Sequence, residues 1–170
     1  MNKERQVRLR AIEPEDLDML YRIENDVELW NVGTTNVPYS RYALHDYVAH
    51  AVGDIFADKQ VRLMVENGEG NAVGIVDLVD FDARNRKAEV GIVIENACRR
   101  RGYATEALRQ LSHYASEILH LHQLYVYVDV GNTASLNLFS KAGWQSSAEL
   151  KDWLYDGKAF HPARLLQTFL

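Results

Sequence analysis

The sequence has a single cysteine, Cys98, among its 170 residues. One cysteine cannot form an internal disulfide or supply a cysteine-rich zinc site. The histidines do not follow a metal-ligand spacing either, so no metal is expected. No apolar run approaches the roughly 20 residues of a membrane-spanning helix, and the charged N-terminal residues do not resemble a signal peptide. These absences indicate a cytoplasmic protein with no membrane partner.

The sequence also has no excess of positively charged residues. The chain carries 19 lysines and arginines against 24 aspartates and glutamates, a net charge of -5. That balance argues against nucleic acid as the main partner and is compatible with a cationic substrate. Hydrophobic and charged fractions of 47% and 25% are those of an ordinary globular protein. With no internal repeat or linker, residues 1–170 are expected to form a single domain.

The most informative stretch is a basic turn between a strand and a helix. Alternation at 88–94 predicts the strand, and apolar residues at helical spacing from Ala104 onward predict the helix. Between them lie Arg99, Arg100, Arg101 and Gly102. Free amides at a helix N-terminus bind anions, glycine permits a close approach, and arginines add directional donors. The turn therefore predicts an anion site, although an ordinary turn with solvated arginines is the alternative.

The rest of the chain alternates strands and helices around this turn. Period-two patterns predict strands at 6–11, 60–66, 72–81 and 124–130, and two more near 145–155 and 159–169. Helical patterns follow Glu13, Ser40 and Asn132, each of which lies at a helix start. The order is β-α-α-β-β-β-α-β-α-β-β. It predicts an α+β fold in which a mostly antiparallel sheet has one parallel crossover at the central helix.

Three segments carry a resemblance to a known family. Arg99-x-x-Gly102-x-Ala104 after a strand resembles the pyrophosphate loop of the GCN5-related N-acetyltransferases, the GNAT family. Residues 74–94 look like the third and fourth strands of that fold, and 124–144 like its fifth strand and fourth helix. The element order matches as well. Within the family, the chain resembles bacterial spermidine N-acetyltransferases, with ribosomal-protein alanine acetyltransferases as close relatives.

The resemblance implies that acetyl-CoA is the cosubstrate and that an amine attacks its thioester directly. The cofactor would lie where the fourth and fifth strands separate, with its pantetheine arm along the fourth strand like an added strand and its pyrophosphate on the loop. The cofactor-binding residues that the resemblance implies are Ile92, Val93, Ile94, Arg99, Arg100, Arg101, Gly102, Tyr103, Ala104, Thr105, Asn132, Ser135, Phe139 and Lys141.

An attacking amine must be neutral, so a general base is useful. Glu89, on the fourth strand, is the candidate for this role, the alternative being an exposed charge on a strand face. Asp77 and Asp80 either recognise a cationic acceptor or are solvated. Trp30 and Tyr39 lie where the family builds its acceptor pocket, although aromatic residues in loops often only pack.

One position departs from the family pattern. Many members have a tyrosine that protonates the departing thiolate, and this chain has Phe139 there. Solvent protonation is the preferred explanation, because a thiolate is a stable leaving group near neutral pH. Alternatively Ser140 or Tyr127 replaces the tyrosine, or catalysis is lost and the chain is a CoA-binding sensor or structural subunit.

The expected function is acetylation of a primary amine, with a polyamine favoured and a protein N-terminus second. Family members are often dimers and the spermidine enzymes form larger assemblies, so a homo-oligomer is expected.

Overall fold

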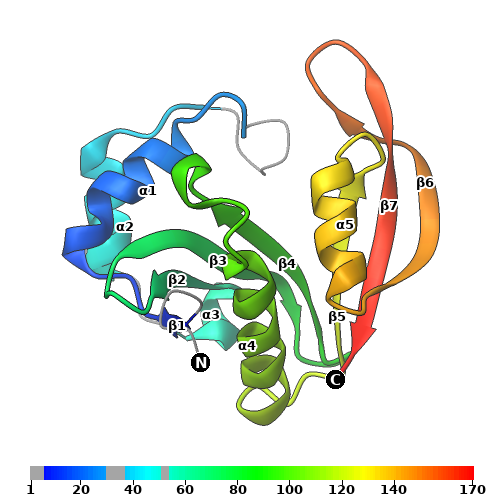
Figure 1. The fold of residues 1–170 in the computed structure, drawn as a ribbon, viewed down its shortest axis with the longest axis horizontal. Helices are drawn as coiled ribbons and strands as arrows, with labels where there is room; N and C mark the ends of the chain where they lie inside the picture. The colour runs from blue at the N-terminus through cyan, green and yellow to red at the C-terminus, as the bar shows by residue number, and fades with distance from the viewer. Residues whose placement is uncertain (1–5, 30–36, 51–53) are drawn as a thin grey trace.

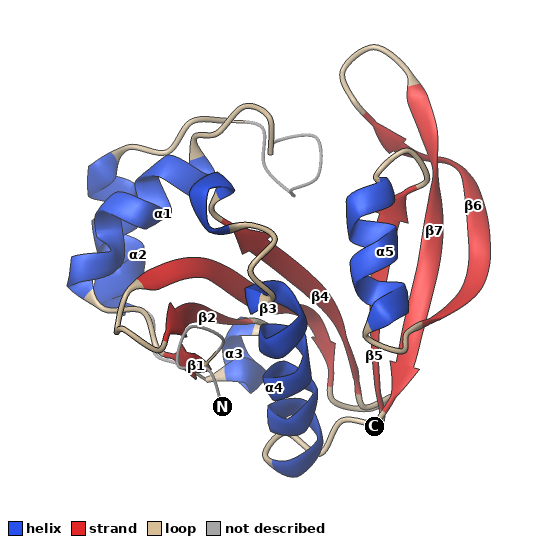
Figure 2. Cartoon of the chain, in the orientation of Figure 1, coloured by secondary structure: helices blue, strands red, loops and turns tan. Residues whose placement is uncertain are grey.

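A seven-stranded sheet forms the centre of the protein, with strand order β1-β2-β3-β4-β5-β7-β6 (Figures 1 and 2). The computed structural model describes residues 6–29, 37–50 and 54–170. The strands are β1 (Val7–Arg10), β2 (Val61–Asn67), β3 (Ala72–Asp82), β4 (Lys87–Ile94), β5 (Gln123–Asp129), β6 (Gln145–Tyr155) and β7 (Phe160–Phe169). The helices are η2 (Pro14–Asp16), α1 (Leu17–Glu24), α2 (Arg41–His50), α3 (Ile55–Asp58), η3 (Asn96–Cys98), α4 (Tyr103–Glu117) and α5 (Thr133–Lys141).

The sheet confirms the predicted α+β class. β4 and β5 run parallel across the α4 crossover, and the other neighbouring pairs in the described sheet are antiparallel. The helix α3 was not predicted, because four residues are too few to show a helical period. It forms because the Asp54 carboxylate accepts a hydrogen bond from the Phe56 amide at 2.9 Å. None of the described helices has the length and apolar character needed to cross a bilayer.

Both faces of β2 and β3 are buried, which explains the consecutive apolar residues in these two strands. Adjacent residues of one strand enter different clusters: Met64 of β2 packs with α1 and α2, whereas Val65 packs with α4 and α5. In β3, Ile75 and Val76 divide in the same way. Because successive side chains point to opposite faces, α1 and α2 cover one face and α4 and α5 the other. The turn before α4 is thereby held against one face of the sheet.

Gly74 lets β3 and β4 approach closely, so we expect Gly74→Ala to destabilise the protein. A Cβ at this position would lie 2.2 Å from the Val93 carbonyl oxygen, which is backbone and cannot rotate away. Forcing the strands apart should lower the free energy of unfolding by about 1–3 kcal/mol, measured by urea denaturation. Gly91→Ala is the control, since its Cβ would meet Asp77 at an ordinary 3.5 Å. Equal losses in both variants would contradict the steric explanation.

Candidate active site

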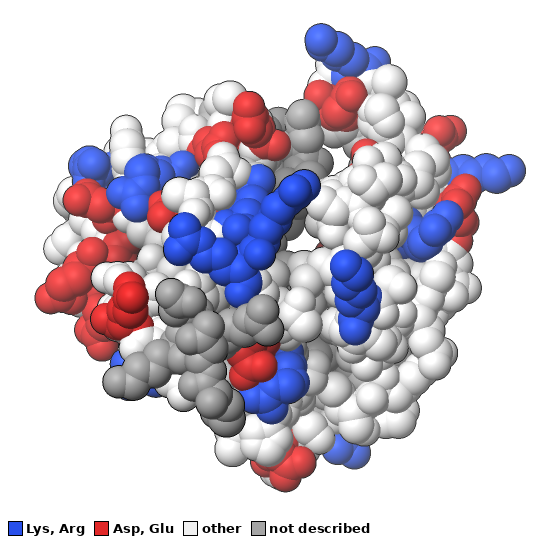
Figure 3. All heavy atoms as spheres, in the orientation of Figure 1, with Lys and Arg blue, Asp and Glu red and all other residues white. Residues whose placement is uncertain are grey.

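The two halves of the sheet separate at a fork between β4 and β5. The parallel strands pair over three positions, and the last pair joins Glu89 to Tyr125. Beyond it β4 continues to Ile94 against β3, and β5 continues to Asp129 against β7. The described strands leave the facing edges of β4 and β5 unpaired there. Figure 1 shows the two strands diverging, and Figure 3 shows the surface hollowed between the halves of the molecule.

The basic turn connects the open end of β4 to α4. Arg100 and Gly102 both have left-handed backbones, with φ of 62° and 88°, and they redirect the chain into the helix. Among the residues that the structure describes, no side chain caps the first turn of α4, so its amides are available to a ligand. Glycine suits the position before Tyr103 because this φ strains other residues.

The arginines of this turn are exposed beside the fork. The Arg99 Nε donates to the Ile94 carbonyl oxygen at 3.0 Å, which ties the turn to the end of β4. Arg101 donates to the Ala97 carbonyl oxygen at 3.3 Å. Figure 3 shows basic side chains gathered over the N-terminal end of α4, next to the hollow. Helix amides, dipole and arginines together suit a diphosphate group.

Glu89 lies at the point where the strands separate and is half-buried. Burial, together with the nearby negative charge of Asp80, raises the pKa of Glu89 to about 7. Asp80 reaches this position because β3 bulges between Val79 and Asp82 and Asp80 itself has a φ of 50°. A carboxylate with this pKa can accept a proton at neutral pH. Alternation placed Glu89 on a strand face, but it could not show the bulge that brings Asp80.

Two tyrosines of β5 lie on the same side of the sheet as Glu89. Their rings are 5.7 Å apart. Burial, and then the charge of Glu89, raise the pKa of Tyr125 to about 12, and the same causes raise the pKa of Tyr127. Both phenols therefore stay protonated at neutral pH.

Asp77 is ion-paired in the structure. The Arg62 guanidinium donates to its two carboxylate oxygens at 2.7 and 3.1 Å and also contacts Glu24. Asp77 can therefore act on an acceptor only as a member of this cluster. The sequence did not predict this cluster, because its members come from three separate elements.

Tyr39 is half-buried against α1. Its amide donates to the Asn25 side-chain oxygen at 2.9 Å, and its carbonyl oxygen accepts from the Asn25 amide nitrogen at 3.1 Å. Asn25 was missed because a single asparagine after a helix gives no signal of a contact 14 residues away. Trp30, the other aromatic candidate, lies outside the described residues.

α5 borders the β5 side of the fork. The Asn132 side-chain oxygen accepts from the Ser135 amide at 3.1 Å, an N-cap that confirms the predicted helix start. Phe139 is 2% exposed and packs against Trp144 at a ring distance of 4.8 Å. Ser140 lines a hollow of about 360 Å³ between α5 and the strands β6 and β7. Lys141 is exposed at the end of the helix.

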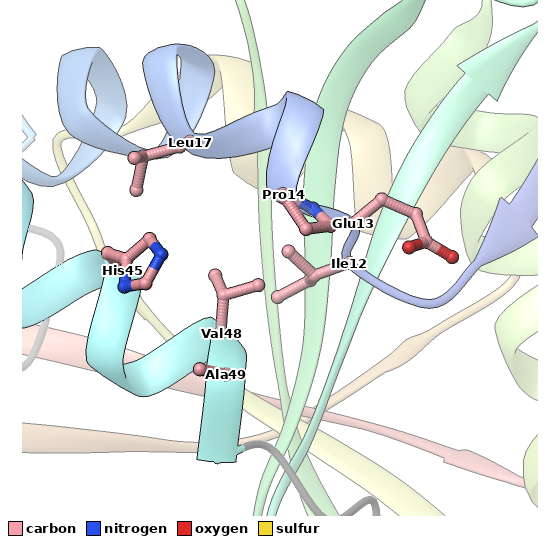
Figure 4. Close-up of a pocket in the computed structure, with 7 residues that line it drawn as sticks. All are labelled: Ile12, Glu13, Pro14, Leu17, His45, Val48 and Ala49. Atoms are coloured by element: carbon pink, nitrogen blue, oxygen red, sulfur yellow. The ribbon is translucent and has the colours of Figure 1, made fainter.

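A separate hollow of about 160 Å³ lies between η2 and α2 (Figure 4). Its lining is mainly apolar, and Figure 4 shows Ile12, Leu17 and Val48 converging on it while the Glu13 carboxylate points away. It includes no residue of the fork. Within the described ranges, no group of three histidine, cysteine or acidic residues is arranged to hold a metal.

Comparison with known proteins identifies the family to which the chain belongs. The family model described as Acetyltransferase (GNAT) domain matches residues 6–145. Spermidine N(1)-acetyltransferase of Escherichia coli K12 is 28% identical over 148 residues, which cover 85% of this chain and 75% of that protein. The putative ribosomal N-acetyltransferase YdaF of Bacillus subtilis is 32% identical over 93 residues, which cover 55% of this chain and 51% of that protein.

Solved structures share the fold over nearly the whole length. Spermidine N-acetyltransferase from Vibrio cholerae, in complex with CoA and spermine, superposes with a TM-score of 0.85 at 24% identity, covering 96% of this chain and 95% of that one. A dodecameric structure of the Vibrio cholerae enzyme has a TM-score of 0.77 at 25% identity, with coverage of 96% and 94%. The resemblance seen in the sequence is confirmed: this chain belongs to the GNAT acetyltransferase family and is an acetyl-CoA-dependent N-acetyltransferase.

Proposed function

We propose that this enzyme acetylates a polyamine, such as spermidine, in the cytoplasm. The observation that carries the proposal is Glu89, a carboxylate with a pKa of about 7 at the end of the β4–β5 pairing, beside the carboxylate of Asp80. Two acidic groups close to the place where the amine reacts favour an acceptor with several ammonium groups. The Escherichia coli relative, a spermidine N(1)-acetyltransferase, supports this choice of substrate.

The residues around the fork fit acetyl-CoA as the cosubstrate. Exposed arginines and the first turn of α4, which no described side chain caps, suit its diphosphate, with donors at Arg99 to Arg101 and the amides of Tyr103 to Thr105. The unpaired edge of β4 at Ile92 to Ile94 suits a pantetheine arm, which would add to the sheet as a short strand. Asn132 and Ser135, at the start of α5, border the same opening from the β5 side. When bound, acetyl-CoA supplies a thioester carbonyl for the amine to attack.

In the proposed mechanism Glu89 takes a proton from the incoming ammonium group. The amine must be neutral to attack, and a base with a pKa of about 7 is largely ionised just above neutral pH. Water protonates the departing thiolate, which needs little help near neutral pH. Phe139 has no proton to donate, and its ring packs in the hydrophobic core.

Free-thiol release from acetyl-CoA tests the proposal. We would compare spermidine, spermine, a diamine and short peptides that start with alanine or serine, and confirm each acetylated product by mass spectrometry. Turnover with the polyamines and not the peptides is the expected result. Turnover with the peptides alone would replace the proposal with protein N-terminal acetylation, the reaction that the YdaF likeness favours.

Thiol release with none of the amines, despite CoA binding, would favour a CoA-binding sensor. We also propose a homo-oligomer, in keeping with the dodecameric relative, and light scattering on the same sample measures its size.

A further inference from the structure

A distortion in β6 directs one aromatic side chain toward the fork. The β6–β7 register shifts between Leu150 and Leu154, opposite Pro162 of β7. Proline has no amide hydrogen to donate, so regular pairing is already interrupted there. Within the shifted segment Asp152 has a φ of 49°, a strained conformation for a residue with a side chain. This bulge places the ring of Trp153 against Tyr127 of β5, 5.3 Å away.

Trp153 is the last of three aromatic rings that form a row beginning beside Glu89. Tyr125 is the register partner of Glu89, Tyr127 follows at 5.7 Å, and Trp153 is next. The Lys87 ammonium lies over the Tyr125 ring, 5.7 Å from its centre, so the first ring already contacts a cation. The row therefore runs from the proposed base, across β5, to the β6–β7 hairpin.

The last ring of the row is poorly explained by packing alone. Trp153 is 51% exposed, whereas Phe139 and Trp144 in the core are almost fully buried. Trp153 thus leaves about half of its surface in water although a residue with a left-handed backbone, Asp152, precedes it and sets its position. β3 has a similar bulge on the other side of the fork, which presents Asp80 to Glu89. Both irregular segments thus add side chains to the region around Glu89.

We infer that Tyr127 and Trp153 form the wall that binds the hydrocarbon and distal ammonium group of the acceptor. Aromatic faces attract both methylene groups and cations, while Glu89 and Asp80 receive the reacting end. Such a wall selects elongated aliphatic polyamines over short amines. The inference rests on the proposed function and adds to it the residues that set acceptor length.

The test compares Trp153→Ala with Phe160→Ala in the full-length protein. Phe160 is the matched control: it lies on the same hairpin, is 63% exposed and stacks on Tyr155 at 4.9 Å, outside the row. We expect Trp153→Ala to raise the KM for spermidine about 10-fold with kcat changed less than about twofold. Phe160→Ala should leave both unchanged.

Two Tyr127 variants separate the ring from its hydroxyl group. Tyr127→Phe keeps the ring and should retain the KM for spermidine, whereas Tyr127→Leu should raise it. A KM unchanged in Trp153→Ala, or raised equally in Phe160→Ala, would overturn the aromatic wall while leaving polyamine acetylation intact. Wild-type protein that acetylates peptides but no polyamine would overturn the proposed function itself, and this inference with it.

Discussion

Glu89→Gln is expected to lower kcat/KM for the amine by about 100-fold near neutral pH, since a positioned general base typically contributes 10²–10⁴-fold. Glutamine keeps the shape of the side chain but cannot take a proton. The substitution therefore removes the chemistry and leaves the strand pairing at the fork in place. Steady-state thiol release with acetyl-CoA and spermidine measures the change.

The pH profile shows whether Glu89 acts as the base. Its carboxylate is protonated below its pKa of about 7, so wild-type kcat/KM should rise with pH and level off above that value. In Glu89→Gln the rise of kcat/KM near pH 7 should be absent, and activity should increase only at more alkaline pH. The amine must then lose its proton without a base, near the pKa of about 10 of an alkyl ammonium group. Superimposable profiles would remove Glu89 from the role of base.

Stability measurements on Glu89→Gln would show whether unfolding contributes to a loss of activity. In the folded protein Glu89 holds its proton up to about pH 7, whereas the unfolded chain releases it near the ordinary value of 4.5. The wild type therefore loses stability as pH rises from the lower value to the higher one. Glutamine has no proton to lose, so at about pH 8 the variant should be more stable by about 1 kcal/mol, a figure reduced because solvent partly screens the site. The two proteins should be equally stable below the lower value.

Arg62→Met is expected to lower the free energy of unfolding by about 3–5 kcal/mol, the usual cost of removing one partner from a buried ionic cluster. The Arg62 side chain is only 23% exposed and neutralises Asp77, while also contacting Glu24. Its pKa is raised by these two carboxylates against the opposing effect of burial. Without it, like charges remain close together in a site partly shielded from water. Urea denaturation at neutral pH measures the loss.

Arg22→Met is the matched control for this prediction. The Arg22 side chain is 61% exposed and pairs with Glu95 at 2.7 Å, so its loss should cost less than about 1 kcal/mol. In Arg62→Met, acid should reduce the deficit relative to the wild type, because protonation removes the repulsion between the carboxylates. A deficit that does not change with pH, or equals that of the control, would show that Arg62 does not stabilise the cluster by its charge.

The sequence by itself determined the features that depend on near neighbours. Alternation identified β4 and β5, because a strand buried on one face repeats every two residues. The Asn132 cap could be predicted because its partner, Ser135, is three residues away. The turn from Arg99 to Gly102 also has a local physical cause, since a strand, a glycine and a helix start follow one another directly.

Only the tertiary structure decided how these parts combine at the fork. Alternation assigns a residue to a face, but it does not say where β4 stops pairing with β5, and that end point puts Glu89 at the opening. The pKa of Glu89 depends on a bulge in another strand, which brings Asp80 near. The contact between Tyr127 and Trp153 likewise depends on a register shift across β7. Such irregularities arise from long-range strand pairing, and a pattern of period two contains no information about them.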